Sequence, residues 1–403
     1  MRTATPEEAG LSPAGLDRVD AAVRAKIDDG VLLGAVTLVA RHGRIVRVRE
    51  MGRAKRFARR PMRRDTLFRV FSMTKPVTGL AMGILADRGL WRPGDPIAKH
   101  LPELENLRVA TGFDGDRPML ADPDHPPTMR ELLTHTAGFT YGRDKADPLH
   151  LVYRREKPFD ARNLDDFVAR VGRLPLAFQP GTSWKYGLAM DLQGAIIERL
   201  TGQSLPEFFR KHIFDPLGMA DTGFGVPREK RGRRSGLYYT GGPFRLLSMP
   251  NPLFRESRGV PWGGMGLVST VDDYARFAQL LLNRGEWAGK RVVSAAAVAA
   301  QLTNQLPEAL TAHGFQAGHM RIRPGFGYGY DGAVCYDPEL ADSPVGRGTY
   351  QWDGAAGTWF WVDPEHDLLY VGLIQLLSYQ APPMQRITQA LLAEAITDRQ
   401  AAR

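Results

Sequence analysis

The hydrophobic pattern of the first 90 residues predicts a helix, a hairpin and a second helix. Apolar side chains recur at near-helical spacing over residues 13–28, which predicts an amphipathic helix. Residues 34–52 read as two β-rich runs around a His-Gly pair, a pattern typical of a hairpin. A strand-like run at 67–71 is followed by an apolar helical pattern over 74–89 that ends at a glycine.

From about residue 91 the pattern becomes mostly helical, and in the last third it is mixed again. Helical patterns that stop at glycine recur through the middle block, at 128–139, 163–174, 189–202 and 204–218. The last third predicts a capped helix, a hairpin-like segment and a closing helix, at 270–285, 349–377 and 384–396.

This order of elements predicts an α/β fold of the α+β type, with an antiparallel sheet flanked by helices. Hairpins dominate over strand-helix-strand units, so we expect the early and late strands to pair antiparallel in one sheet. The predicted division is an α/β lobe built from 1–90 and 250–403, with a mostly helical, all-α lobe inserted at 91–249. The active site is expected between the lobes.

Composition is that of a globular chain with a basic excess. The 403 residues are 43% hydrophobic and 24% charged, with a net charge of +9. Basic residues cluster at 55–64 and 228–234, but neither cluster lies in a nucleic-acid-binding signature. We therefore interpret them as solvated loops and predict no nucleic-acid partner, with a basic protein that binds an anionic polymer as an alternative.

Hydropathy and cysteine content predict a cytoplasmic protein that does not span a membrane. No apolar run approaches the roughly 18 residues of a membrane span. The N-terminus has no apolar segment of the secretory type, so we expect no signal peptide. Cys335 is the only cysteine, which excludes an intramolecular disulfide and fits a reducing compartment.

Candidate chemistry begins with FSMTKPVTG, residues 71–79, where a strand is predicted to become a helix. Ser72 and Lys75 are three residues apart and share one face if the helix begins at the serine. Burial and unpaired N–H groups at a helix start would lower the lysine pKa and leave an amine able to activate a serine nucleophile. Eleven serines and ten lysines give about 0.3 chance matches to this spacing, so other motifs must support it.

Two further stretches offer matching chemistry. Tyr186 follows a Pro-Gly turn and precedes a helix, and a phenol facing Ser72 and Lys75 would carry protons to a leaving group. The run WDGAAGTWFWVDP at 352–364 places small residues in a β-rich segment, where a substrate can lie close to the backbone. A backbone N–H there, with that of Ser72, would form an oxyanion hole.

The ordered motifs resemble those of the class C β-lactamase-like serine hydrolases. S-M-T-K, LLTHTAG, PGT-x-W-x-Y, GG-x-GL-x-ST-x-DD and the W-x-G strand occur in that order, and the likeness spans about residues 10–395. This superfamily includes β-lactamase-fold carboxylesterases (family VIII type), penicillin-binding DD-peptidases and acyltransferases. The resemblance implies an antiparallel sheet flanked by helices, a helical lobe and an active site between them.

The resemblance also implies roles for individual residues. Ser72 matches the nucleophile, Lys75 the lysine of the first motif and Tyr186 the tyrosine of the second, as base and acid. The third motif is occupied by Trp352, Asp353 and Gly354, and the next residue, Ala355, would supply the second oxyanion N–H. An aromatic that lines the pocket in esterase relatives matches Tyr141.

Departures from the lactamase pattern point to esters. Leu188 stands where lactamases have an asparagine that contacts an amide side chain. W-D-G replaces K-T-G, which removes a cation suited to the carboxylate of a β-lactam, adds an apolar wall at Trp352 and brings an opposing charge at Asp353. We therefore count Leu188 and the W-D-G residues among the substrate-binding candidates and predict a serine esterase that cleaves small neutral carboxylic esters.

Several alternatives stay open at this point. Acyl transfer would use the same residues with a different acceptor, and a weak β-lactamase or D-amino-peptidase activity is the enzymatic alternative. A catalytically silent protein that binds β-lactam or peptidoglycan is the non-enzymatic one. We predict no cofactor and no metal site, because no H-E-x-x-H or Cys/His spacing occurs. His135, in LLTHTAG, is interpreted as structural, since Lys75 and Tyr186 already fill the base roles. The sequence does not predict the oligomeric state.

Overall fold

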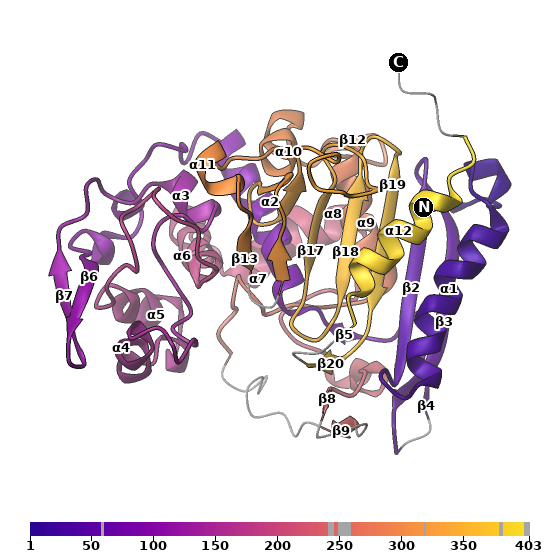
Figure 1. Ribbon diagram of the computed structural model, residues 1–403, viewed down its shortest axis with the longest axis horizontal. Helices are drawn as coiled ribbons and strands as arrows, with labels where there is room; N and C mark the ends of the chain where they lie inside the picture. The colour runs from indigo at the N-terminus through magenta and orange to yellow at the C-terminus, as the bar shows by residue number, and fades with distance from the viewer. Residues whose placement is uncertain (58–59, 241–245, 249–258, 318–319, 379–381, 399–403) are drawn as a thin grey trace.

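The computed structural model describes residues 1–398 except 58–59, 241–245, 249–258, 318–319 and 379–381. Its centre is a sheet in which strands from both ends of the chain pair with each other (Figure 1). The order is β1-β3-β2-β19-β18-β17-β16-β15, with β4 attached to β3. The strands are β1 Arg2–Thr3, β2 Gly34–Arg41, β3 Arg44–Lys55, β4 Arg60–Pro61, β15 Phe326–Tyr328, β16 Ala333–Cys335, β17 Tyr350–Asp353, β18 Trp359–Asp363 and β19 Leu368–Leu373.

The pairing of early and late strands confirms the predicted antiparallel sheet. β2 pairs antiparallel with β3 on one side and with β19 on the other, so the N-terminal hairpin joins the C-terminal strands directly. Only β1 runs parallel to its neighbour, β3, among the pairs of this sheet that the structure describes.

Helices cover both faces of the sheet. α1, Pro13–Asp28, and α12, Met384–Ala395, pack together on one face, as Figure 1 shows. α9, Val271–Leu282, contacts β2, β18 and β19 on the other face. Each face of the sheet has its own hydrophobic core, and the side chains of β18 alternate between the two. Trp359 and Trp361 pack on the face covered by α1, and Phe360 and Val362 pack on the opposite face.

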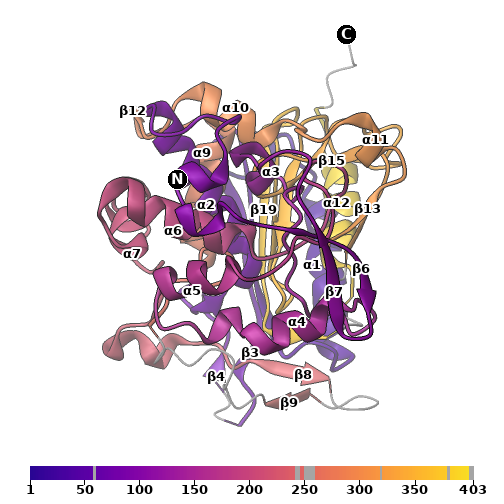
Figure 2. The same ribbon diagram turned by 90° about the vertical axis from the view of Figure 1, so that its left-hand side faces the viewer.

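The middle of the chain is rich in helices and also contains strands. Figure 2 shows α4, α5 and the hairpin β6-β7 on the side that faces the viewer. The hairpin, Val109–Asp114 with Arg117–Ala121, was not predicted from the sequence. The helices of this block are α3 Met129–Leu133, α4 Leu149–Glu156, α5 Leu164–Val171, α6 Ala189–Thr201, α7 Leu205–Phe209 and α8 Asp215–Leu217, with a π-helical turn at Arg210–Phe214.

The remaining elements are short and connect these layers. The strand predicted at 67–71 is only β5, Phe68–Arg69, and it pairs with β10, Val268–Ser269, outside the main sheet. β8, Tyr238–Thr240, pairs with β9, Leu246–Ser248, and with β20, Leu376–Leu377. The others are β11 Glu286–Trp287, β12 Lys290–Arg291, α10 Ala295–Leu302, α11 Glu308–Thr311, β13 Phe315–Ala317 and β14 Met320–Ile322.

Candidate active site

Ser72 lies in a single 3-10 turn, Phe71–Met73, directly before α2, Thr74–Asp87. The apolar pattern predicted a helix from residue 74, which is where α2 begins, so a helical start at Ser72 is met only by the preceding 3-10 turn. Phe71 has a φ of 47°, an unfavourable value for a side chain of this size, and its ring packs on Ala356. Strain of this kind persists where the surroundings hold it, and here it presents a partly exposed serine.

Lys75 is fully buried behind the serine and has three oxygen acceptors. Its Nζ lies 3.3 Å from Ser72 Oγ, 3.1 Å from the Tyr141 hydroxyl and 2.7 Å from the Gly264 carbonyl oxygen. An ammonium group has three N–H donors, so this geometry satisfies it completely. After loss of one proton, two N–H groups remain and the lone pair can accept the serine proton.

Burial lowers the pKa of Lys75 to about 8, and Asp191 and Asp331 oppose this shift. Both carboxyl groups are completely buried. The direction agrees with the expected uncharged amine, but at pH 7 only about one molecule in ten carries it. The amine is therefore a minor species at neutral pH and becomes the major one above pH 8.

Tyr186 lies over the lysine, in the loop before α6. Its ring centroid is 4.6 Å from Lys75 Nζ and 5.4 Å from the Tyr141 ring centroid. Burial raises the pKa of the Tyr186 phenol, and a side-chain hydrogen bond with Ser72 works against that rise. The structure therefore brings the predicted hydroxyl, amine and phenol together at one place.

Tyr141 brings a second phenol to the same amine. From the motifs, Tyr141 was expected only to line the pocket as an aromatic side chain. Its hydroxyl is a hydrogen-bond partner of Lys75, and burial raises the pKa of the phenol well above its ordinary value. The phenol therefore stays protonated at neutral pH and contributes an O–H group to the site.

The W-D-G strand lies beside the serine turn. β17 contacts the turn Phe71–Met73, and the Thr358 hydroxyl donates to the Val70 carbonyl at 3.2 Å. A Cβ on Gly354 would lie 2.3 Å from that same carbonyl oxygen, so only glycine fits here. Ala355 is exposed in the turn that follows, and its N–H donates no hydrogen bond to the residues that the structure describes. A free N–H beside the serine is what an oxyanion hole requires.

The other substrate-binding candidates differ in position. Leu188 is fully buried in the core at the start of α6, so in this conformation it offers a substrate no surface. Trp352 is also buried, and it packs against the Tyr186 ring at 5.6 Å, behind the phenol. Asp353 is partly exposed, and burial raises the pKa of its carboxyl to about 6 while Lys75 opposes the shift.

His135 is enclosed by aromatic rings. Its ring centroid lies 4.9 Å from Tyr186, 5.3 Å from Trp184 and 5.6 Å from Tyr328. Neither ring nitrogen has a hydrogen-bond partner among the described residues, and burial lowers the pKa of the imidazole well below its ordinary value. A neutral ring without a proton acceptor fits the structural interpretation of the sequence.

Sequence reasoning missed the polar groups behind Lys75. Gly264, in a Gly-Gly motif that suggested no chemistry, accepts from Lys75 and donates its N–H to Asp191 Oδ1 at 2.8 Å. Burial raises the pKa of Asp191 to about 6, and Lys75 opposes the shift. Asp331 Oδ1 accepts from Gln193 at 3.0 Å. The only signal in the sequence was a lone acid five residues after Tyr186.

Comparison with known proteins agrees with the family resemblance of the motifs. The sequence profile of the Beta-lactamase family matches residues 19–395. The chain belongs to this family. It is 35% identical to Esterase EstB of Burkholderia gladioli, over 85% of this chain and 86% of the relative. It is 36% identical to Protein Rv1367c of Mycobacterium tuberculosis, over 89% and 90% of the two chains.

A solved structure agrees in fold over almost the whole chain. EstCE1, described as a hydrolase with promiscuous acyltransferase activity, has a TM-score of 0.78 at 26% identity and covers 95% of this chain and 98% of its own. The resemblance stated from the motifs, the predicted fold class and the enzyme class, a serine carboxylesterase-type hydrolase of the β-lactamase fold, are thereby confirmed.

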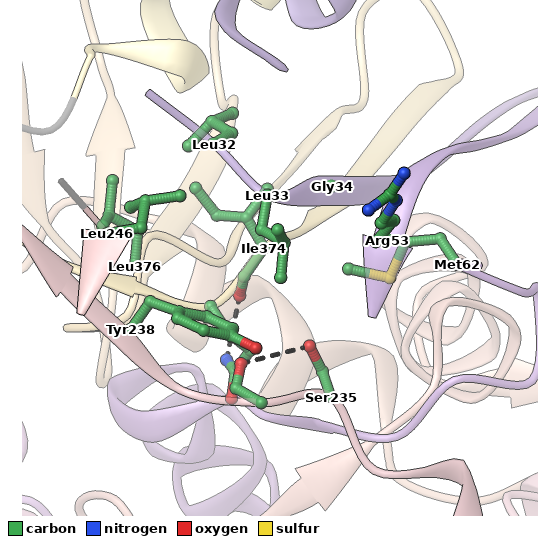
Figure 3. A pocket seen from close by; sticks show the side chains of 12 residues that line it. Leu32, Leu33, Gly34, Arg53, Met62, Ser235, Tyr238, Leu246, Ile374 and Leu376 are labelled. Atoms are coloured by element: carbon green, nitrogen blue, oxygen red, sulfur yellow. Dashed lines mark hydrogen bonds between the residues drawn. The ribbon is translucent and has the colours of Figure 1, made fainter. Parts of the chain in front are cut away.

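A small cavity lies apart from the serine. Figure 3 shows it between Tyr238, Ser235, Met62 and Ile374. Its volume is about 10 Å³, which holds roughly one water molecule. Ser72, Lys75 and Tyr186 do not line it, so this cavity is not part of the candidate site.

The described residues hold neither a metal-ligand cluster nor a membrane-spanning helix. No group of three or more His, Cys, Asp or Glu side chains is arranged to hold a metal ion in the described part of the chain. Within the same residues, no helix is both long and apolar enough to cross a membrane.

Proposed function

We propose that the chain hydrolyses small carboxylic esters through an acyl-enzyme on Ser72. The observation that carries the proposal is the contact of Lys75 Nζ with Ser72 Oγ, with the Tyr186 ring over the same amine. A serine hydroxyl needs an adjacent base to act as a nucleophile, and a lysine with a lowered pKa is such a base.

Acylation forms one bond and breaks another. Ser72 Oγ attacks the ester carbonyl, and its proton passes to Lys75 directly or through Tyr186. The backbone N–H groups of Ser72 and Ala355 stabilise the oxyanion, and the bond to the alkoxy oxygen then breaks. Tyr186 gives a proton to the departing alkoxide and regains one from Lys75, so the alcohol leaves and the acyl group stays on the serine.

Deacylation repeats these steps with water. The Lys75–Tyr186 pair takes a proton from water as its oxygen attacks the acyl carbonyl. The bond to Ser72 Oγ breaks, the serine regains its proton and the carboxylic acid leaves. We do not assign the base role to one member of the pair, because two coupled groups titrate together. The substrate partner is a small-molecule ester. Cys335 is the only cysteine and is buried, so the chain has no intramolecular disulfide, which supports a reducing, cytoplasmic setting.

Acyl transfer is the second candidate. It differs only in the second step, in which an alcohol or amine replaces water. The description of EstCE1 as a hydrolase with promiscuous acyltransferase activity favours it. The exposed Ala355 and partly exposed Ser72 leave the acyl group open to an acceptor other than water.

One set of assays tests the proposal. Wild type, Ser72→Ala and the control Ser343→Ala, which removes a partly exposed serine from a turn outside the site, are compared on p-nitrophenyl acetate and butyrate. We expect turnover in wild type and Ser343→Ala and its loss in Ser72→Ala. Equal turnover in Ser72→Ala would refute the proposal. Comparable hydrolysis of a chromogenic cephalosporin would favour a β-lactamase, and a stable acyl adduct without turnover would favour a binding protein.

A further inference from the structure

Arg143 is an exposed cation held over the aromatic rings of the site. Its guanidinium carbon lies 5.0 Å from the centroid of the Tyr141 ring and 5.8 Å from that of Phe159. Cation–π contact with two rings restrains a guanidinium group without using its N–H donors. No carboxylate among the residues that the structure describes forms an ion pair with it.

Arg143 differs in this respect from several other arginines of the chain. Arg64 binds both carboxylate oxygens of Asp272, and Arg233 binds both of Asp221. Those arginines are used in structural ion pairs. The donors of Arg143 have no such use in the described structure and remain available to a ligand.

The loop that carries Arg143 is anchored on both sides. Gly142 has a φ of 59°, and a Cβ there would lie 2.2 Å from the Tyr153 side chain, so the loop packs against α4. Further along, Asp147 forms an ion pair with Lys185, the residue before Tyr186. The position of Arg143 is therefore tied to the same segments that hold the two phenols.

The charge of Arg143 acts on the interior of the site. It contributes to the lowered pKa of Lys75 and opposes the raised pKa values of Tyr141 and Asp191. Asp353 is a partly exposed acid of the site, and it belongs to β17 on the sheet side. The site thus has a cation on the helical side and an acid on the sheet side.

We propose that Arg143 binds a carboxylate on the substrate, so that the preferred substrates are esters with a second, free carboxylate group. This inference rests on the proposed esterase function. A guanidinium edge matches a carboxylate with two parallel hydrogen bonds. Tyr141 and Phe159 are partly exposed, so the accessible parts of their rings can contact the carbon chain between the carboxylate and the ester. Esters of this kind differ from the neutral esters expected from Leu188 and the W-D-G motif, because that expectation did not include a cation at position 143.

Two matched pairs of esters test the inference. Mono-p-nitrophenyl glutarate differs from p-nitrophenyl butyrate by a carboxylate on the acyl chain, and 4-(butyryloxy)benzoate differs from phenyl butyrate by a carboxylate on the leaving group. The readout is the ratio of kcat/KM within each pair, in which general effects on Lys75 cancel. A charge-assisted hydrogen bond changes such a ratio by about 10-fold to 150-fold. We therefore expect Arg143→Gln to lower the ratio at least about tenfold for one pair.

Two variants serve as controls. Lys145→Gln removes an equal charge from the same exposed loop, without ring contacts in the described structure, and is expected to leave both ratios within about twofold of wild type. Arg143→Lys keeps the charge without the planar fork and is expected to restore part of the ratio. Unchanged ratios in Arg143→Gln, or an equal loss in Lys145→Gln, would overturn the inference.

A binding measurement separates this inference from the esterase proposal. If wild type hydrolyses none of the four esters, the proposed function fails, and the subsite is tested by titrating glutarate into Ser72→Ala and into Ser72→Ala combined with Arg143→Gln. Glutarate binding that the second substitution weakens at least about tenfold would support the subsite. Equal binding, or none in either protein, would overturn it.

Discussion

Replacing Gly354 with alanine tests the proposed oxyanion hole. The added Cβ would lie 2.3 Å from the Val70 carbonyl oxygen and 2.3 Å from Thr358 Oγ1. Contacts of side-chain carbons below about 3 Å are not tolerated, so the turn must move by roughly 0.7 Å or more. The turn carries Ala355, and Val70 precedes the serine by two residues. The movement therefore separates the two proposed N–H donors.

The expected loss follows from this displacement. Overpacking of a tight site costs about 1–3 kcal/mol of unfolding free energy. Misplacing a catalytic group by about 1 Å, or losing one oxyanion donor, lowers the rate by about 100-fold or more. We expect Gly354→Ala to lower kcat on p-nitrophenyl butyrate by at least about tenfold, with a smaller change in KM.

The assay pairs steady-state kinetics with urea denaturation. Gly94→Ala is the control, because a Cβ there would meet no atom within 4 Å and the backbone is not in the left-handed region. The control should keep both kcat and stability near wild type. If Gly354→Ala also kept its kcat within about twofold and its stability within about 0.5 kcal/mol of wild type, the oxyanion assignment would be refuted.

Three further predictions concern the base. In wild type, kcat/KM should fall about tenfold per pH unit below pH 8, because protonation of Lys75 removes the base, and a flat profile between pH 6 and 8 would contradict this. Asp191→Asn removes a charge that raises the Lys75 pKa, so the inflection of that profile should move to lower pH, and a move to higher pH would count against the assigned role. Tyr186→Phe should lower kcat by about 100-fold to 10,000-fold. Tyr141→Phe should lower it by less, since Tyr141 contacts Lys75 and has no described contact with Ser72. The reverse order of kcat values would exchange the roles of the two phenols.

Much of the fold follows from periodicity in the sequence. The helix at 13–28 was predicted to the residue, because its apolar side chains recur at helical spacing. The hairpin at 34–52 was predicted within three residues, because two β-rich runs flank a His-Gly pair. The hairpin β6-β7 was missed because its strands are largely exposed, with Met119 51% exposed, and exposed strands carry little apolar alternation. The helical pattern at 74–89 starts where α2 starts, but the 3-10 turn that holds Ser72 was not predicted, since a 3-10 turn before a helix has no distinct pattern.

Prediction of the site was partial for a similar reason. Spacing and motif order located Ser72, Lys75 and Tyr186, which the structure brings together. Asp191 and Asp331 were not found, because they approach Lys75 only through tertiary packing. The partner of Lys75 at Gly264 is a backbone carbonyl, and any residue type carries one. Polar networks that form behind a catalytic group are therefore visible only in the folded chain.

Mass spectrometry of the protein during turnover tests the proposed chemistry most directly. The enzyme is mixed with p-nitrophenyl acetate, quenched with acid and digested. We expect one acetyl group on the peptide that contains Ser72 in wild type, and none on the corresponding peptide of Ser72→Ala. Acetyl transfer to a different residue at the rate of turnover, or full turnover in Ser72→Ala, would contradict an acyl-enzyme on Ser72.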